Sequence, residues 1–346
     1  MSDLARIQIL HLDGSDEEES ILNLVNNGVV IFDLSEIQIK EWEKNIISLG
    51  ERTFGFEKIQ LDERFAFYKD CVFIYYPWKN SILVTFKMEV FRSLRYLRNK
   101  YKITSQEQEL LLGKEVVIVG MSVGLSVFKA MVLEGLAGKY RISDFDTIDI
   151  TNLNRIDTGV FSVGSQKVLE AYQFAMEQDP FLEVEVWDCP IEKDNISFFL
   201  DESVDLIVDE CDSIVTKVLL RRKARELSVP LIMHTSDRGM LDIELYNDLN
   251  FDASWTLEKY GSYSEDEIKL NAISIIADFC DLKGADQRAK FSFSEIGKSI
   301  TSWPQLGGDV LAGGGNVASA ARSLLLGHKV KAGRYLLDPV LQFKAD

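Results

Sequence analysis

The sequence predicts an α/β protein in which a doubly wound, mostly parallel, Rossmann-like sheet follows a small α/β or α+β N-terminal module. Three observations predict this fold class. From Glu115 onward, short apolar runs alternate with helical patterns, as expected of parallel strands that are covered on both faces. A glycine loop follows the first run, and an acidic residue follows the second.

The alternating pattern begins with the apolar run Val116–Val119, a glycine loop and a helix to about Ala137. The later predicted elements are strand Arg141–Ser143, helix Lys167–Met176, strands Val184–Trp187 and Leu206–Val208, helix Ile214–Leu227 and strand Leu231–Met233. Residues 246–303 are less regular, and we expect them to form insertions over the ligand edge of the sheet. The glycine-dense run Gly307–Gly315 is expected to form a turn that opens a helix over Val317–Leu326.

We predict three parts in the chain: an N-terminal module (1–85), a basic helix and linker (86–110), and a nucleotide-binding domain (111–346). Short apolar runs suggest strands in the first part. In the second, apolar residues recur at helical spacing between Phe86 and Tyr101, and arginines occupy the other faces. The simplest interpretation of this helix is that its basic side chains face water.

Composition excludes several functional classes. The 346-residue chain has a net charge of −17, is 46% hydrophobic and 27% charged, and is therefore typical of a folded, acidic protein. Such a charge disfavours nucleic acid as a partner. No apolar run reaches the ~18 residues of a membrane span, so we expect no membrane partner and a cytoplasmic location. The cysteines Cys71, Cys189, Cys211 and Cys280 form no C-x-x-C pair, so neither a structural zinc nor a disulfide framework is indicated.

Two motifs indicate a nucleotide site. The loop Gly120-Met-Ser122-Val123-Gly124 joins a strand to a helix, where backbone N–H groups and the helix dipole favour an anion. Asp144 follows the next strand, 24 residues after Gly120, and an acidic residue in that place commonly binds ribose hydroxyls. These features indicate an adenosine ligand without separating NAD from ATP.

The following loop favours ATP. It runs Asp144-Phe-Asp146-Thr-Ile-Asp-Ile-Thr-Asn152-Leu-Asn-Arg155, with Gly164-Ser-Gln-Lys167 beyond it. This stretch resembles the signature D-x-D-x-V-x-x-S-N-L-N-R and G-x-x-K of the ubiquitin-activating, ThiF/MoeB/HesA superfamily. The resemblance covers about Arg95 to Leu326. It departs from the family in the glycine loop, which is usually G-x-G-G-x-G, and in the absence of a paired-cysteine zinc module.

The resemblance implies roles for individual residues. Arg155 and Lys167 would contact the phosphates, Asp144 the ribose, and Asp212 a Mg²⁺ ion bound to the phosphates. Asn152 would orient the phosphate-side loop, and Asp146 would brace it. The alternative for Asp212 is that it caps the helix beginning at Ile214, which Ser213 could do equally well. Arg95-Tyr-Leu-Arg98 resembles the family motif R-Y-x-R, from which an arginine reaches the neighbouring subunit, so Arg98 and a homodimer are also implied.

The implied activity is ATP-dependent adenylation of a carboxylate. Its source would be the C-terminus of a small glycine-terminated ubiquitin-like protein, a sulfur carrier or a peptide. An NAD(P)-dependent oxidoreductase and a non-catalytic partner subunit of the same fold remain as alternatives. Cys280 is the one candidate for a thioester-forming nucleophile, while packing roles are expected for the other cysteines. His234 and Arg238 could face the substrate or serve structural contacts.

Overall fold

The computed structural model describes residues 6–10, 15–42, 44, 71–235, 238–280 and 287–338. The chain divides into two compact units. The N-terminal unit comprises Met1–Thr104 with Asp179–Phe181, and the C-terminal unit comprises Ser105–Gln178 with Leu182–Asp346. No helix within the described ranges is long and apolar enough to cross a membrane.

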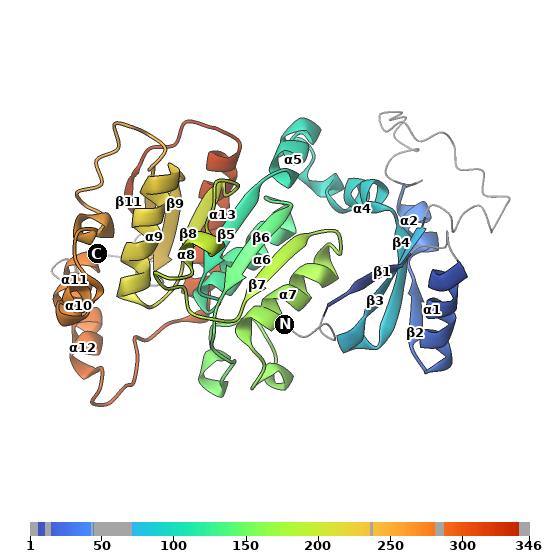
Figure 1. Ribbon diagram of the computed structural model, residues 1–346, viewed down its shortest axis with the longest axis horizontal. Helices are drawn as coiled ribbons and strands as arrows, with labels where there is room; N and C mark the ends of the chain where they lie inside the picture. Colours follow the sequence, from blue (N-terminus) through green and yellow to red (C-terminus); the bar gives the residue numbers. More distant parts are fainter. Residues whose placement is uncertain are drawn as a thin grey trace, which may run out of the picture. The chain divides into compact units, whose positions relative to one another are not determined.

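The described part of the N-terminal unit has a mixed four-stranded sheet with strand order β1-β3-β4-β2 (Figure 1). Its strands are β1 (Gln8–Leu10), β2 (Val30–Asp33), β3 (Cys71–Tyr76) and β4 (Ser81–Phe86). The antiparallel pair β3 and β4 is joined by the short helix η3 (Pro77–Lys79), whereas β2 runs parallel to β4. Its helices include α1 (Ser15–Asn26) and α2 (Ser35–Trp42), and its core contains Ile21, Phe73 and Val84.

The basic helix predicted between Phe86 and Tyr101 is shorter than expected. It consists of α4 (Met88–Arg95) and the 3₁₀ helix η4 (Leu97–Asn99), because the backbone leaves the α-helical conformation at Tyr96. Arg92 does not simply face water. Its Nε donates to Oδ2 of the buried Asp179 at 2.9 Å, so at least this arginine has a structural contact.

The C-terminal unit confirms the predicted fold class. Its described residues form a mostly parallel seven-stranded sheet, order β11-β10-β9-β8-β5-β6-β7. The strands are β5 (Glu115–Val119), β6 (Lys139–Ser143), β7 (Glu183–Trp187), β8 (Leu206–Asp209), β9 (Leu231–Thr235), β10 (Met240–Glu244) and β11 (Gly333–Leu336). Strands β5 to β9 are parallel, and the two antiparallel strands β10 and β11 extend the sheet beyond β9.

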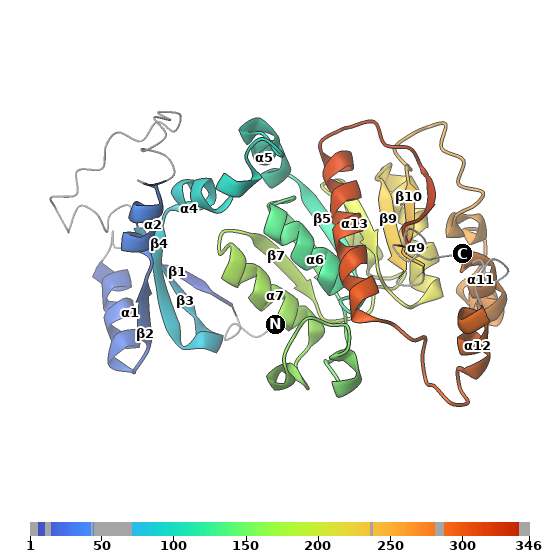
Figure 2. The same cartoon turned by 180° about the vertical axis from the view of Figure 1, so that it is seen from behind.

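Helices cover both faces of this sheet (Figures 1 and 2). One face carries α6 (Val123–Glu134), α7 (Lys167–Gln178) and α13 (Gly307–Leu325). The other carries α8 (Ile196–Phe199) and α9 (Ile214–Leu227), with α10 (Glu265–Leu270) and α11 (Ala272–Phe279) packed on α9. The remaining helices of the unit are α5 (Ser105–Leu112), α12 (Gln287–Glu295), η5 (Ile150–Asn152), η6 (Val160–Ser162) and η7 (Leu257–Tyr260).

The glycine-dense run Gly307–Gly315 is helical, which corrects the prediction of a turn. It forms the first half of α13. Two of its glycines are required by close packing. A Cβ on Gly313 would lie 2.0 Å from the His234 ring, and one on Gly314 would lie 2.7 Å from the carbonyl oxygen of Ser126 in α6. The low helix propensity of glycine is therefore offset by the close approach of α13 to β9 and α6.

The strand order creates a topological switch point. The chain moves from β5 outward through β6 to β7 and then returns to place β8 on the other side of β5. The connections after β5 and β8 therefore leave the sheet in opposite directions, and a crevice opens between the carboxyl ends of the two strands. Ligands of doubly wound sheets bind in this position.

Candidate functional site

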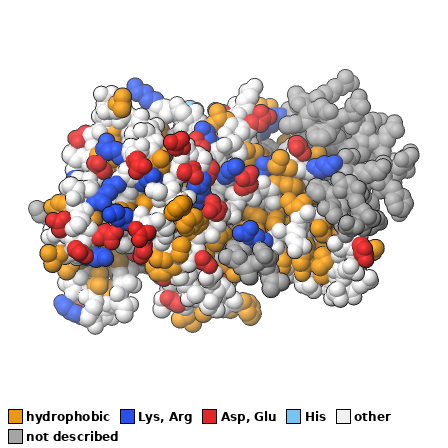
Figure 3. Space-filling model, in the orientation of Figure 1, with side chains coloured by type: hydrophobic (Ala, Val, Ile, Leu, Met, Phe, Trp, Pro, Cys, Tyr) orange, Lys and Arg blue, Asp and Glu red, His pale blue; other side chains and the backbone are white. Residues whose placement is uncertain are grey.

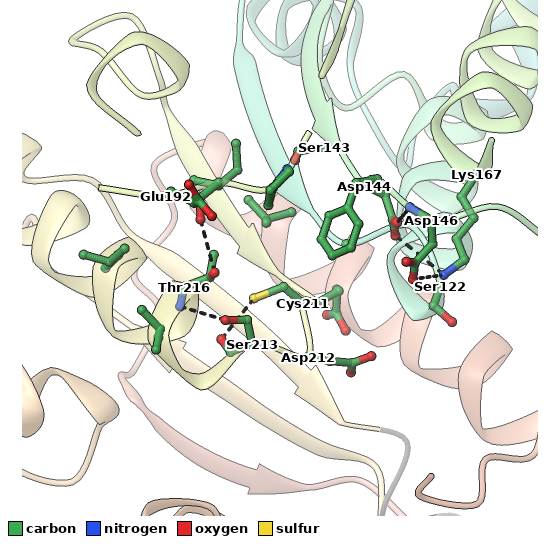
Figure 4. A pocket seen from close by; sticks show the side chains of 18 of the residues that line it. Ser122, Ser143, Asp144, Asp146, Lys167, Glu192, Cys211, Asp212, Ser213 and Thr216 are labelled. Atoms are coloured by element: carbon green, nitrogen blue, oxygen red, sulfur yellow. Dashed lines mark hydrogen bonds and ion pairs between the residues drawn. The ribbon is translucent and has the colours of Figure 1, made fainter. Parts of the chain in front are cut away.

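A pocket lies at this crevice, with a volume of about 270 Å³ (Figure 4). Segments that follow β5, β6, β7 and β8 line it, together with the first turns of α9 and two residues of α10. Lys167, Asp144, Asp146 and Ser122 lie together at one side in Figure 4, and Glu192, Thr216, Ser213 and Cys211 lie at the other. The other lining residues are Val119, Gly120, Ser143, Phe145, Pro190, Ile191, Glu210, Asp212, Val215, Leu219, Glu265 and Lys269.

The glycine loop passes directly over the end of β8. Gly120 has a φ of 94°, and a Cβ on it would lie 2.5 Å from the carbonyl oxygen of Glu210. Only glycine combines this left-handed conformation with such a close approach. Ser122 is the N-cap residue of α6, yet its side chain makes no capping hydrogen bond and lines the pocket instead.

Asp144 supports the glycine loop from the adjacent strand. Its Oδ2 accepts a hydrogen bond from Met121 N at 2.7 Å, and its Oδ1 accepts one from Asp146 N at 2.8 Å. Burial raises the pKa of Asp144, and the two backbone donors and Lys167 oppose that rise. Lys167 Nζ lies 2.8 Å from Asp146 Oδ2 and 4.0 Å from Asp144 Oδ2. An anion near this ammonium would compete with both carboxylates.

The loop after β6 is ordered by its own side chains. Asp149 and Asn152 form a capping box around η5, in which Asn152 is buried. Nη1 of Arg155 donates to the carbonyl oxygen of Thr151 at 3.1 Å and to Oδ1 of Asn154 at 3.0 Å. Neither Asn152 nor Arg155 lines the pocket, so in this conformation the Arg155 guanidinium is bound to its own loop.

The end of β8 resolves the question of which residue caps α9. The Ser213 side chain accepts a hydrogen bond from Thr216 N at 3.2 Å and is the N-cap. Asp212 is therefore not needed as the cap, and its side chain lines the pocket (Figure 4). Thr216 donates through Oγ1 to the carbonyl oxygen of Ile191, which joins the start of α9 to the segment after β7.

A buried ionic network underlies this strand end. Arg221 is fully buried and donates to Asp209 Oδ2 at 2.5 Å and to Glu244 Oε1 at 2.7 Å. Lys217 Nζ lies 3.0 Å from Asp209 Oδ1, and Tyr246 donates to Glu244 Oε2 at 2.6 Å. Burial alone would raise the pKa of Asp209, but Lys217 and Arg221 hold it at about 2. Burial raises the pKa of Glu244 despite Arg221. The network joins β8, α9 and β10.

The structure brings together only some of the residues predicted for the site. Those that line the pocket are Gly120, Ser122, Asp144, Asp146, Lys167 and Asp212. The pocket lining does not include Val123 and Gly124, which begin α6, nor Asn152 and Arg155, which belong to the segment after β6. Arg98 lies in η4, in the N-terminal unit.

The cysteines and the remaining candidates occupy different environments. Cys280 is half-buried at the C-terminal end of α11, and its carbonyl oxygen accepts a hydrogen bond from Arg238 at 2.8 Å. It does not line the pocket, whereas Cys211 does. Burial raises the pKa of the Cys211 thiol well above its usual range, which disfavours the reactive thiolate. His234 is buried beneath Gly313, neither ring nitrogen has a hydrogen-bond partner, and burial lowers its pKa to about 4.

Sequence reasoning missed several pocket residues. Glu210 is buried, and burial raises its pKa well above the ordinary range. The sequence could have indicated Glu210, because it lies between Asp209 and the predicted site residue Asp212. Glu265 and Lys269 reach the pocket from α10, and no motif marks them. Among the lining residues of the described chain there are six carboxyl groups and two ammonium groups. The pocket is thus markedly acidic.

Comparisons with known proteins give one family match and several relatives. Residues 96–238 match the model of the ThiF family. The uncharacterized protein MT1398 of Mycobacterium tuberculosis is 33% identical over 268 residues, which cover 76% of this chain and 37% of that protein. The adenylyltransferase and sulfurtransferase MOCS3 of Aedes aegypti is 26% identical over 215 residues, covering 61% of this chain and 46% of that protein. The chain spans less than half the length of either relative.

A solved structure supports the same fold. The E. coli tRNA N6-threonylcarbamoyladenosine dehydratase TcdA, in complex with ATP, aligns with a TM-score of 0.51 at 17% identity. The alignment covers 68% of this chain and 95% of that chain. At this level of identity, the likeness establishes a shared fold.

Proposed function

Because the chain belongs to the ThiF/MoeB superfamily, we propose that its C-terminal unit is an ATP-dependent adenylyltransferase of the ubiquitin-like modifier-activating type. One observation carries the proposal. The glycine loop, Asp144, Lys167 and Asp212 come from separate segments and meet in one pocket at the switch point of the sheet. The name of the MOCS3 relative and the ATP in the TcdA complex support the same class of ligand and reaction.

In this proposal the triphosphate lies at the side of the pocket that contains Ser122 and Lys167. The N-terminal N–H groups of α6 and the Lys167 ammonium bind phosphate oxygens, which replaces the contact between Lys167 and Asp146. Asp144 binds the ribose, because its carboxylate is already fixed by two backbone donors. The more apolar wall, with Pro190, Ile191 and Leu219, remains for the base.

Arg155 has a conditional role. Its guanidinium must leave the Thr151 carbonyl and Asn154 to contact a phosphate. The buried Arg155 Nε has no hydrogen-bond partner in this conformation. Breaking two contacts on the surface loop costs little, since a typical intramolecular hydrogen bond contributes only about 1 kcal/mol. Asn152 keeps the backbone of this loop in place through its capping box.

The acidity of the pocket fits a requirement for Mg²⁺. Apart from Glu210, whose pKa burial raises, five carboxyl groups face two ammonium groups and would repel a bare triphosphate. Asp212 would hold the ion together with phosphate oxygens and water, which suits a hard cation that keeps oxygen ligands. The ion supplies neutralisation of negative charge on the phosphates. With Ser213 acting as the helix cap, the Asp212 carboxylate is available for this role.

The proposed chemical step is an in-line displacement. A carboxylate oxygen of the substrate attacks the α-phosphorus of ATP, and a new phosphorus–oxygen bond forms. The bond from the α-phosphorus to the bridging oxygen breaks, and pyrophosphate leaves with the electron pair. The chain's own residues orient the nucleotide and neutralise charge, and they make no covalent bond. The substrate would be a small glycine-terminated ubiquitin-like protein, a sulfur carrier or a peptide, and the enzyme would act as a cytoplasmic homodimer to which Arg98 contributes.

Exchange of labelled pyrophosphate into ATP, measured with the carboxylate substrate and Mg²⁺, tests the proposal. Lys167→Met should lower exchange by about 10² or more, because charge stabilisation of this kind contributes several kcal/mol. Lys139→Met, which removes an exposed lysine from β6, is the matched control. Asp212→Asn should shift the Mg²⁺ titration to higher concentration. Unchanged exchange in Lys167→Met, with the fold intact, would remove Lys167 from the mechanism.

A further inference from the structure

Glu210 occupies an unusual position for a carboxylic acid. It is 7% exposed, directly follows β8, and lies beneath the glycine loop while also lining the pocket. Its N–H donates to the carbonyl oxygen of Val119 at 2.8 Å, which ties the end of β8 to the end of β5. Neither the proposed phosphate contacts nor the proposed metal ligand uses this residue.

Both glycines of the loop meet Glu210. A Cβ on Gly120 would lie 2.5 Å from the backbone carbonyl oxygen of Glu210. Any residue at position 210 has this oxygen, so this contact does not depend on the side chain. A Cβ on Gly124 would lie 3.2 Å from Glu210 Cβ and 3.5 Å from its Cγ, so here the side-chain stem makes the contact. Ile118 Cγ2, at 3.3 Å, is the other neighbour on this side. The stem of Glu210 therefore forms part of the surface on which the first turn of α6 rests.

The carboxyl group fixes the stem in place. Its Oε1 accepts a hydrogen bond from His234 N at 3.1 Å, on the adjacent strand β9. Because one end of the side chain is tied to β9 and its stem packs under Gly124, the side chain cannot shift without losing a buried hydrogen bond. A buried acceptor or donor left unpaired in this way is costly. Through this hydrogen bond, β9 helps to fix the position of the glycine loop.

We propose that Glu210 is a positioning residue that sets the height of the glycine loop above the end of β8, and so the place at which the nucleotide phosphates meet the N-terminus of α6. This inference rests on the proposed function, since it assumes a nucleotide in the pocket. It requires packing and a hydrogen-bond acceptor at position 210, not a negative charge. Glutamine keeps the whole stem and the acceptor, whereas alanine keeps only the Cβ and loses both the Cγ and the acceptor.

The test combines Glu210→Gln, Glu210→Ala, Gly124→Ala and the double variant Glu210→Ala/Gly124→Ala, with exposed Glu202→Ala as control. Calorimetric titration with Mg-ATP gives the Kd, and pyrophosphate exchange gives KM and kcat. Glu210→Gln should stay within about threefold of wild type. Glu210→Ala should raise the Kd and KM for ATP at least fivefold, with a smaller change in kcat. In the double variant, the loss should be smaller than the product of the single losses, because Glu210→Ala removes the Cγ that a Cβ at position 124 would meet at 3.5 Å, while the contact with the Cβ of residue 210 remains.

Three other outcomes would each overturn the inference. Equal losses in Glu210→Gln and Glu210→Ala would mean that charge matters, not position. Wild-type affinity in Glu210→Ala, or multiplicative losses in the double variant, would mean that the stem does not set the loop. A wild-type protein that does not bind Mg-ATP would overturn the proposed function as well, so the two failures are distinguishable.

Discussion

Replacing Arg221 with methionine tests the buried network under the candidate site. Arg221 is fully buried and is the cation shared by Asp209 and Glu244. After its removal Asp209 keeps Lys217 and Glu244 keeps the Tyr246 hydroxyl, but Glu244 loses its cation. Removing one partner of a buried ion pair typically costs about 3–5 kcal/mol. We expect a loss in that range, a large share of the stability of a typical domain.

The loss of stability in Arg221→Met should also depend on pH, in a direction that the pKa of Glu244 determines. Burial already raises the pKa of Glu244, and removal of Arg221 raises it further. A carboxyl whose folded-state pKa lies above its unfolded value destabilises the fold at high pH, and this penalty disappears as pH falls toward the unfolded value. The deficit of Arg221→Met should therefore be larger at pH 8 than at pH 5.5.

Urea denaturation at the two pH values measures the change, and hydrogen–deuterium exchange of peptides from β8 and β10 assigns it to the C-terminal unit. Lys139→Met is the control, since the exposed pair of Lys139 and Glu183 lies outside the network and should contribute little to stability. A loss below about 1 kcal/mol for Arg221→Met, or a deficit independent of pH, would refute the reasoning.

Two further predictions concern α13 and the strand beneath it. Gly314→Ala should destabilise the C-terminal unit by about 1–3 kcal/mol, because a Cβ would lie 2.7 Å from the Ser126 carbonyl oxygen. Gly315→Ala, which has open space around its Cβ, should stabilise the unit by up to about 1 kcal/mol. Equal effects of the two variants on urea denaturation would contradict the packing argument. Burial lowers the pKa of His234 to about 4, so its unfolded form takes up a proton first as pH falls from about 6.5 to 4, and stability should drop by about 3 kcal/mol across that window. His234→Leu should flatten this part of the stability profile, so an unchanged slope in that variant would exclude His234 as its source.

The fold class was predictable because its signals are local. Buried parallel strands are almost wholly apolar, and β5, β8 and β9 occur where apolar runs alternate with helical periodicity. The family resemblance rested on short motifs of neighbouring residues and is confirmed by the match over residues 96–238. The helical state of the glycine run at Gly307–Gly315 was not predictable, because it depends on contacts with residues about 80 to 190 positions away.

The candidate site was predictable only in outline. Asp144 and Lys167 belong to two short motifs that lie close together in the sequence, and the structure places both at the pocket. Arg155 ends the motif that begins at Asp144, yet its guanidinium is bound within its own loop, since side-chain direction depends on local hydrogen bonds that a motif does not encode. Glu265 and Lys269 come from α10, whose docking on α9 depends on distant packing.

By itself, the sequence determined that the chain has the spacing of a nucleotide-binding fold: a strand, then a glycine loop, an acidic residue and a lysine. It could do so because hydrophobic periodicity and turn chemistry act over neighbouring residues. Only the tertiary structure decided that Ser213, and not Asp212, caps α9, and that Glu210 supports the glycine loop. These outcomes depend on which backbones approach within a few ångströms of each other. That proximity arises when separate strands pair side by side, and no spacing along the chain specifies it.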